Sequence, residues 1–335
     1  MPGQAITLAR AGALAPFVDF LDEVGAPYGR FLESARLSPD LFADPSALFP
    51  LRQGMRFIDA AAHSQGIDDI GLVVGRRTGI TGLLPLGGLI SPQQTLDQAI
   101  AVLIRGAAWF NPGARLSLAC RGDRAFFRHS IPTMPHREAH LFSLMVMIDV
   151  VRLAAGPRWQ PIAVYLPRGE QGRSRAYEAL LGAPCHRGTD CWTLVFDKDL
   201  LAQTLRFARS ASRSSDEIMA GLQRTAPAGD FEGSLRQLIA SMLSLGAPTL
   251  NAVAEAGGLS PRTLQRRLSE CGRTYSDLVE DARFDAAKRL LRRNDLRIVD
   301  IALELGYSDA ANFTRAFRRW SGSAPRTARI SEIRS

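Results

Sequence analysis

The segment IVDIALELGYSDAANFTRAFRRW, residues 298–320, has the pattern of two short helices joined at Gly306. Phe313, Phe317 and Trp320 recur three or four residues apart, which is the spacing of one face of an α-helix. Three arginines lie between these aromatic residues. We therefore expect the aromatic stripe to be buried and the arginines to face a partner of opposite charge.

A second copy of this pattern lies upstream in TLNAVAEAGGLSPRTLQRRLSECG, residues 249–272. Gly258 precedes Gly306 by 48 positions, whereas Leu264 precedes Phe313 by 49, so one residue is inserted between these points. Core positions, the glycine turn and a following serine all recur in the same order. The repeat predicts two tandem helix-turn-helix units.

Ser260 and Ser308, which are also 48 residues apart, precede the second helix of each unit. Serine is a favoured N-cap, and Pro261 suits the first position of a helix. We expect both serines to cap their helices and to lie where a phosphate is bound. A helix over 276–293 joins the units and rises about 27 Å. That length is of the order of the roughly 34 Å between successive major grooves, with some bending of the DNA.

A helix-turn-helix unit places its second helix in the major groove of duplex DNA. In the first unit Leu264 and Leu268 define the buried face, so the opposite face is free for reading. Arginine pairs with guanine and glutamine with adenine, each giving about 1–3 kcal/mol of discrimination. The candidate base readers are Arg262, Gln265, Arg266, Asn312 and Arg315. Arg318 and Arg319 are predicted to contact phosphates or to remain solvated.

The positive charge is concentrated at the C-terminal end. The whole chain carries a net charge of +8. From Ser234 onward there are 17 basic and 11 acidic residues, against 24 and 22 in the first 233 residues. An excess of this kind suits contact with a polyanion, although a solvated basic surface explains the charge equally well.

The chain before the repeat mixes helical and strand patterns, and it is followed by a polar, Ser/Arg-rich stretch. The sequence therefore predicts an N-terminal α+β domain followed by an all-α DNA-binding domain with two helix-turn-helix units. The predicted boundaries are 1–209 for the first domain, 210–232 for a linker and 233–335 for the second domain. Helices are expected over 12–35, 51–63, 95–109 (opened by Ser91-Pro92), 136–154 and 234–245. Strands are expected over 114–131 (two, around the turn at 121–123), 160–167 and 191–197.

Residues 234–329 resemble the DNA-binding domain of the AraC/XylS family of transcription regulators. The resemblance lies in LSPRTLQRRLSECGRTYSDLVEDARFDAAKRLL and IVDIALELGYSDAANFTRAFRRWSGSAPRTAR. It implies that double-stranded promoter DNA is the partner and that Arg262, Thr263, Gln265 and Arg266 contact it from the first unit. In the second unit it implies that Ala310, Ala311, Asn312, Arg315 and Arg318 contact the DNA. The two alanines depart from the long polar side chains of some members. They offer only apolar contact, for instance to a thymine methyl group, so the first unit is expected to discriminate better.

Roughly residues 15–205 resemble the "arabinose-binding domain of AraC transcription regulator, N-term" type found in a subgroup of this family. The resemblance lies in FLESARLSPDLFADPSALFPL, IGLVVGRRTGITGLLPLGGLISPQQTLDQAI and APCHRGTDCWTLVFDKDLL. It implies effector sensing or dimerisation without identifying the ligand. We accordingly expect a homodimer that responds to a small-molecule effector and acts together with RNA polymerase.

Two segments rich in Leu, Phe and Met, around 80–110 and 141–151, are candidate pocket walls. They favour an apolar or amphipathic effector over a sugar, because few Trp or paired polar residues stand out. Ordinary hydrophobic core explains the same residues equally well, and Arg-containing loops offer an alternative site for a carboxylate.

Metal and catalytic patterns are weak. His136 and His140 share a helical face, but the glutamate between them is out of register for a zinc protease motif. Cys185, His186 and Cys191 lack a fourth zinc ligand. We expect surface or capping histidines, buried thiols, no metal, no cofactor and no enzymatic activity.

Composition narrows the class further. Hydrophobic residues make up 46% and charged residues 22% of the chain, which is typical of a globular protein. The longest apolar run, 141–151, contains Asp149 and is too short for a membrane helix. Without a secretion signal and with four cysteines, the chain is expected in the cytoplasm, away from membranes. Two rival interpretations remain, an enzyme domain fused to a DNA-binding tail and a module that binds only protein.

Overall fold

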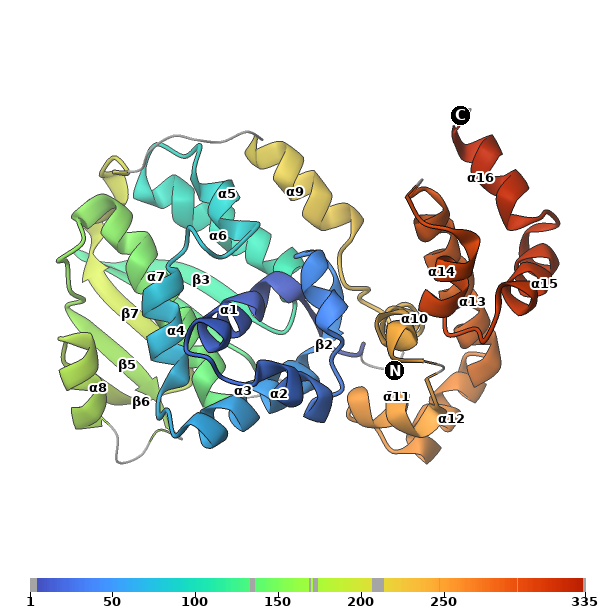
Figure 1. The fold of residues 1–335 in the computed structure, drawn as a ribbon. Coiled ribbons are helices and arrows are strands. Elements are labelled where there is room, and N and C mark those ends of the chain that lie inside the picture. Colours follow the sequence, from blue (N-terminus) through green and yellow to red (C-terminus); the bar gives the residue numbers. More distant parts are fainter. Residues whose placement is uncertain are drawn as a thin grey trace.

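A five-stranded mixed sheet organises the N-terminal domain in the computed structural model (Figure 1). The structure describes residues 5–132, 136–168, 170, 174–206, 214–246, 248–293 and 295–333. The strand order is β3-β4-β7-β5-β6, with β5 and β6 parallel and the other neighbours antiparallel. The strands are β3 (Arg115–Arg121), β4 (Arg124–Ser130), β5 (Ala163–Pro167), β6 (Cys185–Thr189) and β7 (Trp192–Asp197). The predicted hairpin and the strands at 160–167 and 191–197 are therefore confirmed.

Helices pack on one face of this sheet and enclose its large hydrophobic core. The central helix α7 (Arg137–Ala155) contacts β4, β7 and α4 (Ile70–Thr78). Gly71 and Gly75 allow that approach, because a Cβ atom at Gly71 would lie only 2.0 Å from the backbone oxygen of Glu138. The other helices of this domain are α1 (Ala15–Glu23), α2 (Tyr28–Ser34), α3 (Leu51–Gln65), α5 (Leu86–Ile90), α6 (Leu96–Phe110) and α8 (Ser174–Leu181).

Two predicted helix boundaries in this domain are wrong. The single helix expected over 12–35 is broken between α1 and α2, because Gly25 adopts a left-handed conformation (φ 69°) and Pro27 follows it. Helix α6 begins at Leu96 rather than at the Ser91-Pro92 pair. Thr95 is its N-cap and forms a reciprocal capping box with Gln98.

The C-terminal domain is entirely helical in its described residues, as predicted. Its helices are α10 (Phe231–Met242), α11 (Leu250–Ala256), α12 (Pro261–Glu270), α13 (Tyr275–Leu291), α14 (Ile298–Glu304), α15 (Ala310–Ser321) and α16 (Pro325–Ile333). Helices α10 to α13 surround a first helical core that contains Leu264 and Leu268. Helices α13 to α16 surround a second helical core that contains Phe313 and Phe317. Each helix-turn-helix unit thus has a core of its own.

The predicted linker over 210–232 is wrong for much of its length. Helix α9 (Ser215–Arg224) begins at a capping box between Ser214 and Glu217 and packs on α5 and α6 of the N-terminal domain. Its apolar side chains, Ile218, Met219 and Leu222, recur at helical spacing and join the large core. Residues 210–213 lie outside the described part of the chain.

The N-terminal segment joins the two domains through a ribbon that the sequence analysis did not predict. Strand β1 (Leu8–Arg10) pairs antiparallel with β2 (Leu48–Pro50). Ala9 and its partner Phe49 face the large core, whereas Leu8 and Leu48 pack on the first helical core. Ile6 lies in the same helical core, and its backbone N–H donates to Ser234 Oγ at 2.9 Å. The β1–β2 ribbon is therefore a wall of both cores.

Arg10, the last residue of β1, is fully buried, and its side chain is held by neutral oxygen atoms. Its guanidinium donates to the backbone oxygens of Trp109, Ser46 and Leu222 and to Thr225 Oγ1, at 2.7–3.1 Å. Burial lowers the pKa of this side chain, with Asp44 opposing the shift. Arg10 thus fastens the end of α9 to α6 and to the loop before β2.

Replacing Arg10 with Met should lower the free energy of unfolding by about 2–4 kcal/mol, because several buried oxygens lose their donor. Urea denaturation followed by circular dichroism measures the change. Arg30→Met, at an exposed position on α2, is the matched control. Equal stability of the two variants would contradict the fastening role of Arg10.

Within the described ranges, no helix has both the length and the apolar character needed to cross a membrane.

Candidate nucleic-acid interface and ligand cavity

Helix α12 is built as the sequence predicted. Ser260 is its N-cap and accepts a hydrogen bond from the backbone N–H of Thr263 at 3.1 Å. Leu264 and Leu268 are buried in the first helical core. The side chains that face outward are Arg262, Gln265 and Arg266. DNA contact by these residues stays a prediction, but the face that would make it is free.

Two of the predicted contact residues on α12 have partners within the helix. The hydroxyl groups of Thr263 and Ser260 lie 2.8 Å apart. Arg266 Nε lies 3.6 Å from Glu270 Oε1 in an exposed pair one turn apart. Such exposed pairs contribute little stability, so Arg266 can exchange its carboxylate for a base edge at small cost.

Helix α15 departs from the prediction at its N-terminus. Its N-cap is Asp309, whose Oδ1 accepts from the backbone N–H of Asn312 at 2.7 Å, so the assignment of Ser308 as N-cap is wrong. The inserted residue precedes the cap, which shifts the equivalent of Ser260 from 308 to 309. That backbone hydrogen bond lowers the pKa of Asp309, which keeps a negative charge at the start of α15. A carboxylate there disfavours a phosphate at Ser308.

The polar residues of α15 are bound to one another. Asn312 Nδ2 donates to Asp309 Oδ2 at 2.6 Å, and its Oδ1 accepts from Arg315. Ala310 packs partly against the second helical core, which leaves Ala311 as the exposed alanine. Reading by Asn312 or Arg315 therefore requires this local network to open.

The basic end of α15 contains one paired arginine. Arg319 Nη2 lies 2.6 Å from Glu280 Oε1 on α13, and the indole N–H of Trp320 donates to the other oxygen of Glu280 at 3.2 Å. Trp320 was predicted to be core, but it is only half-buried at the edge of the second helical core, with its ring tilted against that of Phe284. The side chain of Arg318 is exposed and makes no hydrogen bond or ion pair with any residue that the structure describes.

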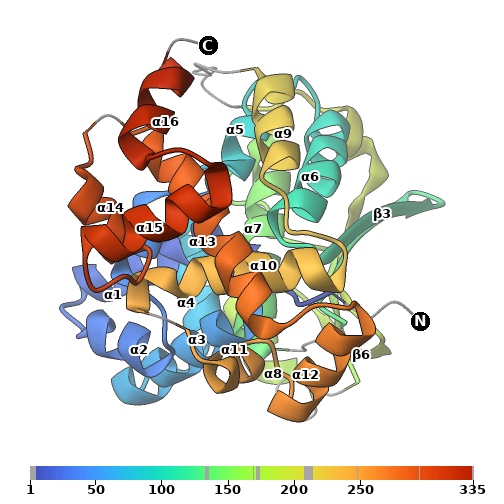
Figure 2. The ribbon, with the colours of Figure 1, turned by 90° about the vertical axis from the view of Figure 1, so that its right-hand side faces the viewer.

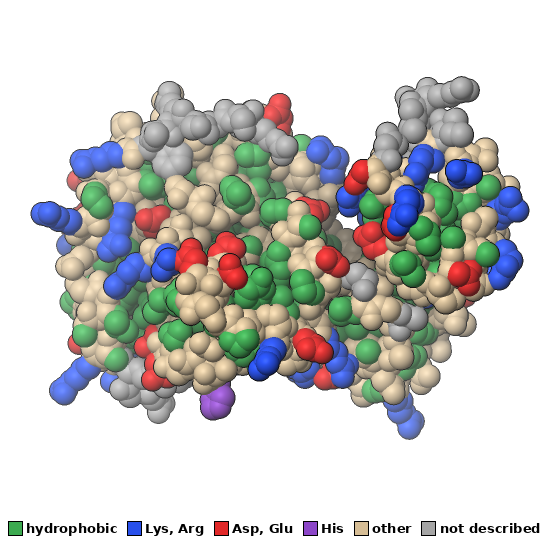
Figure 3. Space-filling model, viewed as in Figure 1, with side chains coloured by type: hydrophobic (Ala, Val, Ile, Leu, Met, Phe, Trp, Pro, Cys, Tyr) green, Lys and Arg blue, Asp and Glu red, His purple; other side chains and the backbone are tan. Residues whose placement is uncertain are grey.

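The second helices of the two units, α12 and α15, are the candidate recognition helices. They lie on the side of the C-terminal domain that faces away from the sheet (Figures 1 and 2). Helix α13 separates them and has 17 residues, a rise of about 26 Å. Figure 3 shows Lys and Arg side chains along the outer edge of this domain, over α15 and α16. The arrangement can present two helices and positive charge to one side of a duplex.

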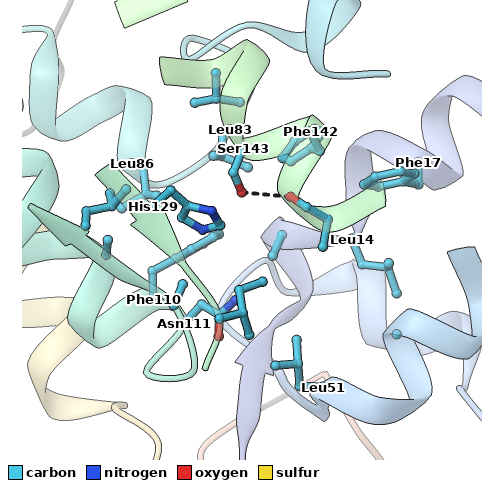
Figure 4. Close-up of a pocket in the computed structure, with 18 of the residues that line it drawn as sticks. Leu14, Phe17, Leu51, Leu83, Leu86, Phe110, Asn111, His129, Phe142 and Ser143 are labelled. Atoms are coloured by element: carbon cyan, nitrogen blue, oxygen red, sulfur yellow. Dashed lines mark hydrogen bonds between the residues drawn. The ribbon is translucent and has the colours of Figure 1, made fainter. Parts of the chain in front are cut away.

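A cavity of about 110 Å³ lies in the N-terminal domain, between helices and the strands β3 and β4 (Figure 4). The predicted segments supply part of its wall, which includes Leu83, Leu86, Leu103, Ala107, Phe110, Phe142, Ser143, Val146 and Met147. Sequence reasoning missed the rest, which includes Leu14, Phe17, Phe49, Leu51, Met55, Ile58, Asn111 and His129. Phe17 lies on the apolar face of α1, and Leu14 is the residue just before this helix. Such apolar spacing indicates burial without distinguishing a cavity from core.

His129 is the most deeply buried polar side chain in the cavity wall. Its Nδ1 lies 3.2 Å from Nδ1 of His140, so one ring donates to the other. Burial lowers the pKa of His129 to about 3 and that of His140 to about 4, so both rings are neutral at physiological pH. His140 is therefore not the surface histidine that was expected.

The other metal candidates have ordinary roles. His136 is the N-cap of α7 and contacts Asp59 at 2.8 Å. Cys185 is buried, and burial raises the pKa of its thiol to about 11. Cys191 is half-buried beside Thr193. Among the described residues, no three His, Cys, Asp or Glu side chains converge on a point where they could hold a metal ion.

Two helix-turn-helix units with outward polar faces, attached to a separate α+β domain, define the class of two-domain DNA-binding regulators. Residues 25–205 match the family described as the arabinose-binding domain of AraC transcription regulator, N-term, and residues 253–330 match a helix-turn-helix domain. The first match alone spans more than half of the chain. This chain belongs to the AraC family of DNA-binding transcription regulators and carries the arabinose-binding type of N-terminal domain.

Known proteins are similar to this chain over nearly its whole length. The chain is 25% identical to the HTH-type transcriptional regulator VirS of Mycobacterium tuberculosis, over 96% of each protein. It is 24% identical to the ornithine utilization regulator of Pseudomonas aeruginosa, over 96% of this chain and 95% of that protein. The crystal structure of transcriptional regulator CdpR from Pseudomonas aeruginosa is 23% identical, covers 91% of this chain and 96% of its own, and has a TM-score of 0.40.

Replacing Asp309 with Ala should lower the melting temperature by a few degrees, because α15 loses its N-cap. Ser308→Ala is the matched control and should change it less. Because the pKa of Asp309 is lowered on folding, its contribution is present above the unfolded pKa and is lost as the pH falls through the folded pKa. Thermal scans at neutral and strongly acidic pH test both statements. A larger effect of the Ser308 variant would restore serine as the cap.

Proposed function

We propose that this regulator reads promoter DNA in a sequence-specific manner through α12 and α15, under the control of a small-molecule effector in the N-terminal cavity. The observation that carries the first half is the division of each recognition helix into two faces. Leu264 and Phe313 are buried, while the arginines at 266 and 315 are exposed. A helix anchored in this way can enter a groove without exposing its core.

The first unit contributes most of the base discrimination in this proposal. Arg262, Gln265 and Arg266 are long polar side chains on one exposed face, and only Arg266 has a weak partner within the helix. The second unit has the short Ala311 and an Asn312 that is held by Asp309 and Arg315. Because the hydrogen bonds of that network must break first, a base contact that replaces them contributes less to the free energy of DNA binding. Helix α15 would therefore add orientation and affinity more than sequence information.

Contacts with phosphates would fix the register of the complex. Arg318 is exposed and unpaired among the described residues, so it can meet the backbone without losing an existing partner. Ser260 and Thr263 lie at the N-terminus of α12, where backbone N–H groups favour an anion. These contacts carry no sequence information by themselves.

Replacing Arg266 with Ala should relax the preference at one base position and cost about 1–3 kcal/mol on the matched operator. Arg318→Ala should weaken binding to all duplexes alike and reduce the salt slope by about one unit. An operator is first selected from a pool of random duplexes by its binding to the full chain. Fluorescence anisotropy with this operator and its single-base variants, at several salt concentrations, then separates the two effects. An unchanged base preference in the Arg266 variant would rule out direct readout by that side chain.

The β1–β2 ribbon supports the second half of the proposal, which is effector control. Phe49 and Leu51 line the cavity, while the neighbouring Leu48 packs on the first helical core together with Leu8. A ligand that displaces the cavity wall would therefore displace a wall of the helical core that anchors α12. Control requires that the ligand bind the two arrangements with unequal affinity. A cavity in this domain also favours a ligand sensor over a module that binds only protein.

Ion pairs add a second contact between the domains. Glu255 on α11 lies 2.9 Å from Arg36 after α2 and 2.9 Å from Arg56 on α3. All three side chains are about half exposed, so salt weakens these pairs. The apolar ribbon is therefore the stronger link between the cavity and α12, and the ion pairs orient the domains.

Leu8→Ala should lower the free energy of unfolding by about 2–5 kcal/mol and reduce the effect of a bound ligand on DNA affinity, because the shared wall loses packing. Leu245→Ala, at an exposed position, is the control and should change neither quantity appreciably. Chemical denaturation and ligand-dependent anisotropy measure the two effects. Undiminished ligand control in a destabilised Leu8 variant would exclude the ribbon as the route.

We further propose that two copies act together at a promoter and that RNA polymerase is the partner through which transcription changes. Membership of a family of transcription regulators supports the second statement. The resemblance of the N-terminal domain to the arabinose-binding type, which implies effector sensing or dimerisation, supports the first. Sedimentation equilibrium of the full chain, with and without operator, tests the stoichiometry. Transcription from the operator-bearing promoter in vitro tests the response of the polymerase.

A further inference from the structure

The wall of the cavity is apolar on almost every side. Its described lining consists mainly of Leu, Ile, Val, Met, Phe and Ala side chains, and no described lining residue is charged. The polar side chains that face it are those of His129, Asn111 and Ser143 (Figure 4). A site of this composition binds through buried apolar area and uses a few polar groups to orient the ligand.

Two nitrogen atoms in this wall lack a protein partner among the described residues. His129 is 3% exposed, and its Nδ1 pairs with His140, which leaves Nε2 without a hydrogen bond. Asn111 uses its Oδ1 to accept from the backbone N–H of Gly113 at 3.2 Å, which leaves its Nδ2 hydrogens available. Ser143 already donates to the backbone oxygen of Ala139 at 2.9 Å. The cavity wall thus has few unused hydrogen-bonding groups, and they belong to His129 and Asn111.

The size of the cavity limits the ligand to about one ring. Its volume is about 110 Å³. An engineered cavity of about 150 Å³ in another protein, lined by similar side chains, binds benzene. Because this cavity is slightly smaller than that one, a ligand with a single six-membered ring and small substituents fits only if the wall moves outward.

We propose that the effector is a small uncharged molecule, essentially one apolar ring or short chain with a single hydrogen-bonding group directed at His129. This inference rests on the proposed function in one respect, namely that the cavity is the effector site. It excludes sugars, because the hydroxyl groups of a pentose exceed the polar atoms available here. It also excludes carboxylates, because an ionised group in this cavity would have no cationic partner among the described lining residues.

The paired histidines can serve either a hydrogen-bond acceptor or a hydrogen-bond donor on a neutral ligand. When His140 donates its Nδ1 hydrogen to His129, the Nε2 of His129 carries a hydrogen and can donate to a carbonyl oxygen. When His129 donates instead, its Nε2 presents a lone pair to a hydroxyl group. Burial keeps both rings neutral, so the pair offers no charge that would attract an anion.

Four single-ring probes and one sugar test the proposal on the full-length chain by isothermal titration at pH 7.4. We expect 4-methylphenol to bind about three- to tenfold more tightly than toluene, the difference expected for one hydrogen bond. We expect 4-methylbenzamide to bind at least about a hundredfold more tightly than 4-methylbenzoate, which has the same shape but carries a charge. L-Arabinose should show no binding.

Matched variants locate the binding. Ala107 lines the cavity on α6, and the adjacent Ala108 is exposed, so Ala107→Leu should abolish binding whereas Ala108→Leu should not. His129→Leu should reduce the ratio of the affinities for 4-methylphenol and toluene from about three- to tenfold to about one. A general loss of stability would weaken both ligands alike and would leave the wild-type ratio unchanged. Circular dichroism and melting temperatures confirm that each variant is folded.

The outcomes separate this inference from effector control. Equal binding of 4-methylbenzoate and 4-methylbenzamide, arabinose binding that Ala107→Leu removes, or no binding by any neutral probe would each overturn the ligand class. Operator affinity is measured with and without saturating probe. If 4-methylphenol binds in the cavity but leaves operator affinity unchanged, the ligand class stands and effector control by such molecules fails. If arabinose or 4-methylbenzoate alters operator affinity through the cavity, effector control stands and the ligand class fails.

Discussion

The side chains of β1 alternate between two hydrophobic cores, and the arrangement of the domains depends on this alternation. Ala9 lies in the large core of the N-terminal domain, whereas Leu8 lies in the core that anchors α12. Because successive side chains of a strand point to opposite faces, one short segment is enough to form a wall of both cores. A displacement of β1 or β2 therefore cannot remain within one domain. Arg10 fixes the same segment to α9 through neutral oxygens.

The candidate recognition helices α12 and α15 have the same two-faced construction, but their polar side chains differ in the hydrogen bonds that they already make. Both bury an apolar stripe and turn a polar face outward. On α12 the cap is a neutral serine and the long side chains are nearly free. On α15 the cap is a carboxylate that also holds Asn312, and Asn312 in turn accepts from Arg315. Since existing hydrogen bonds must be exchanged for new ones, the two helices would gain different net free energies on entering the same DNA groove.

The cavity and the interface rely on opposite uses of polarity. On the proposed DNA-binding face, exposed charges would interact with phosphates over a distance and be screened by salt. In the N-terminal domain, a neutral histidine pair and one amide are the main polar features of an apolar wall. Few polar atoms mean few ways to satisfy a polar ligand, so in the proposed effector site selectivity would come from polar groups of the ligand that find no partner. Phe49 and Leu51 connect this cavity to the ribbon that the helical core shares.

The sequence by itself determined the helix-turn-helix repeat, the buried positions Leu264, Leu268, Phe313 and Phe317, and the α+β character of the first domain. These features follow from local periodicity, which a single chain segment displays. Local pattern also indicated two segments of the cavity wall, although it did not distinguish them from core. Only the tertiary structure decided that α9 packs on the first domain, that Asp309 rather than Ser308 caps α15, and that His129 faces a cavity beside His140. It also decided the sharing of β1 and β2 between cores, because contacts between residues more than two hundred positions apart, such as Ile6 with Ser234, leave no periodic signal in the chain.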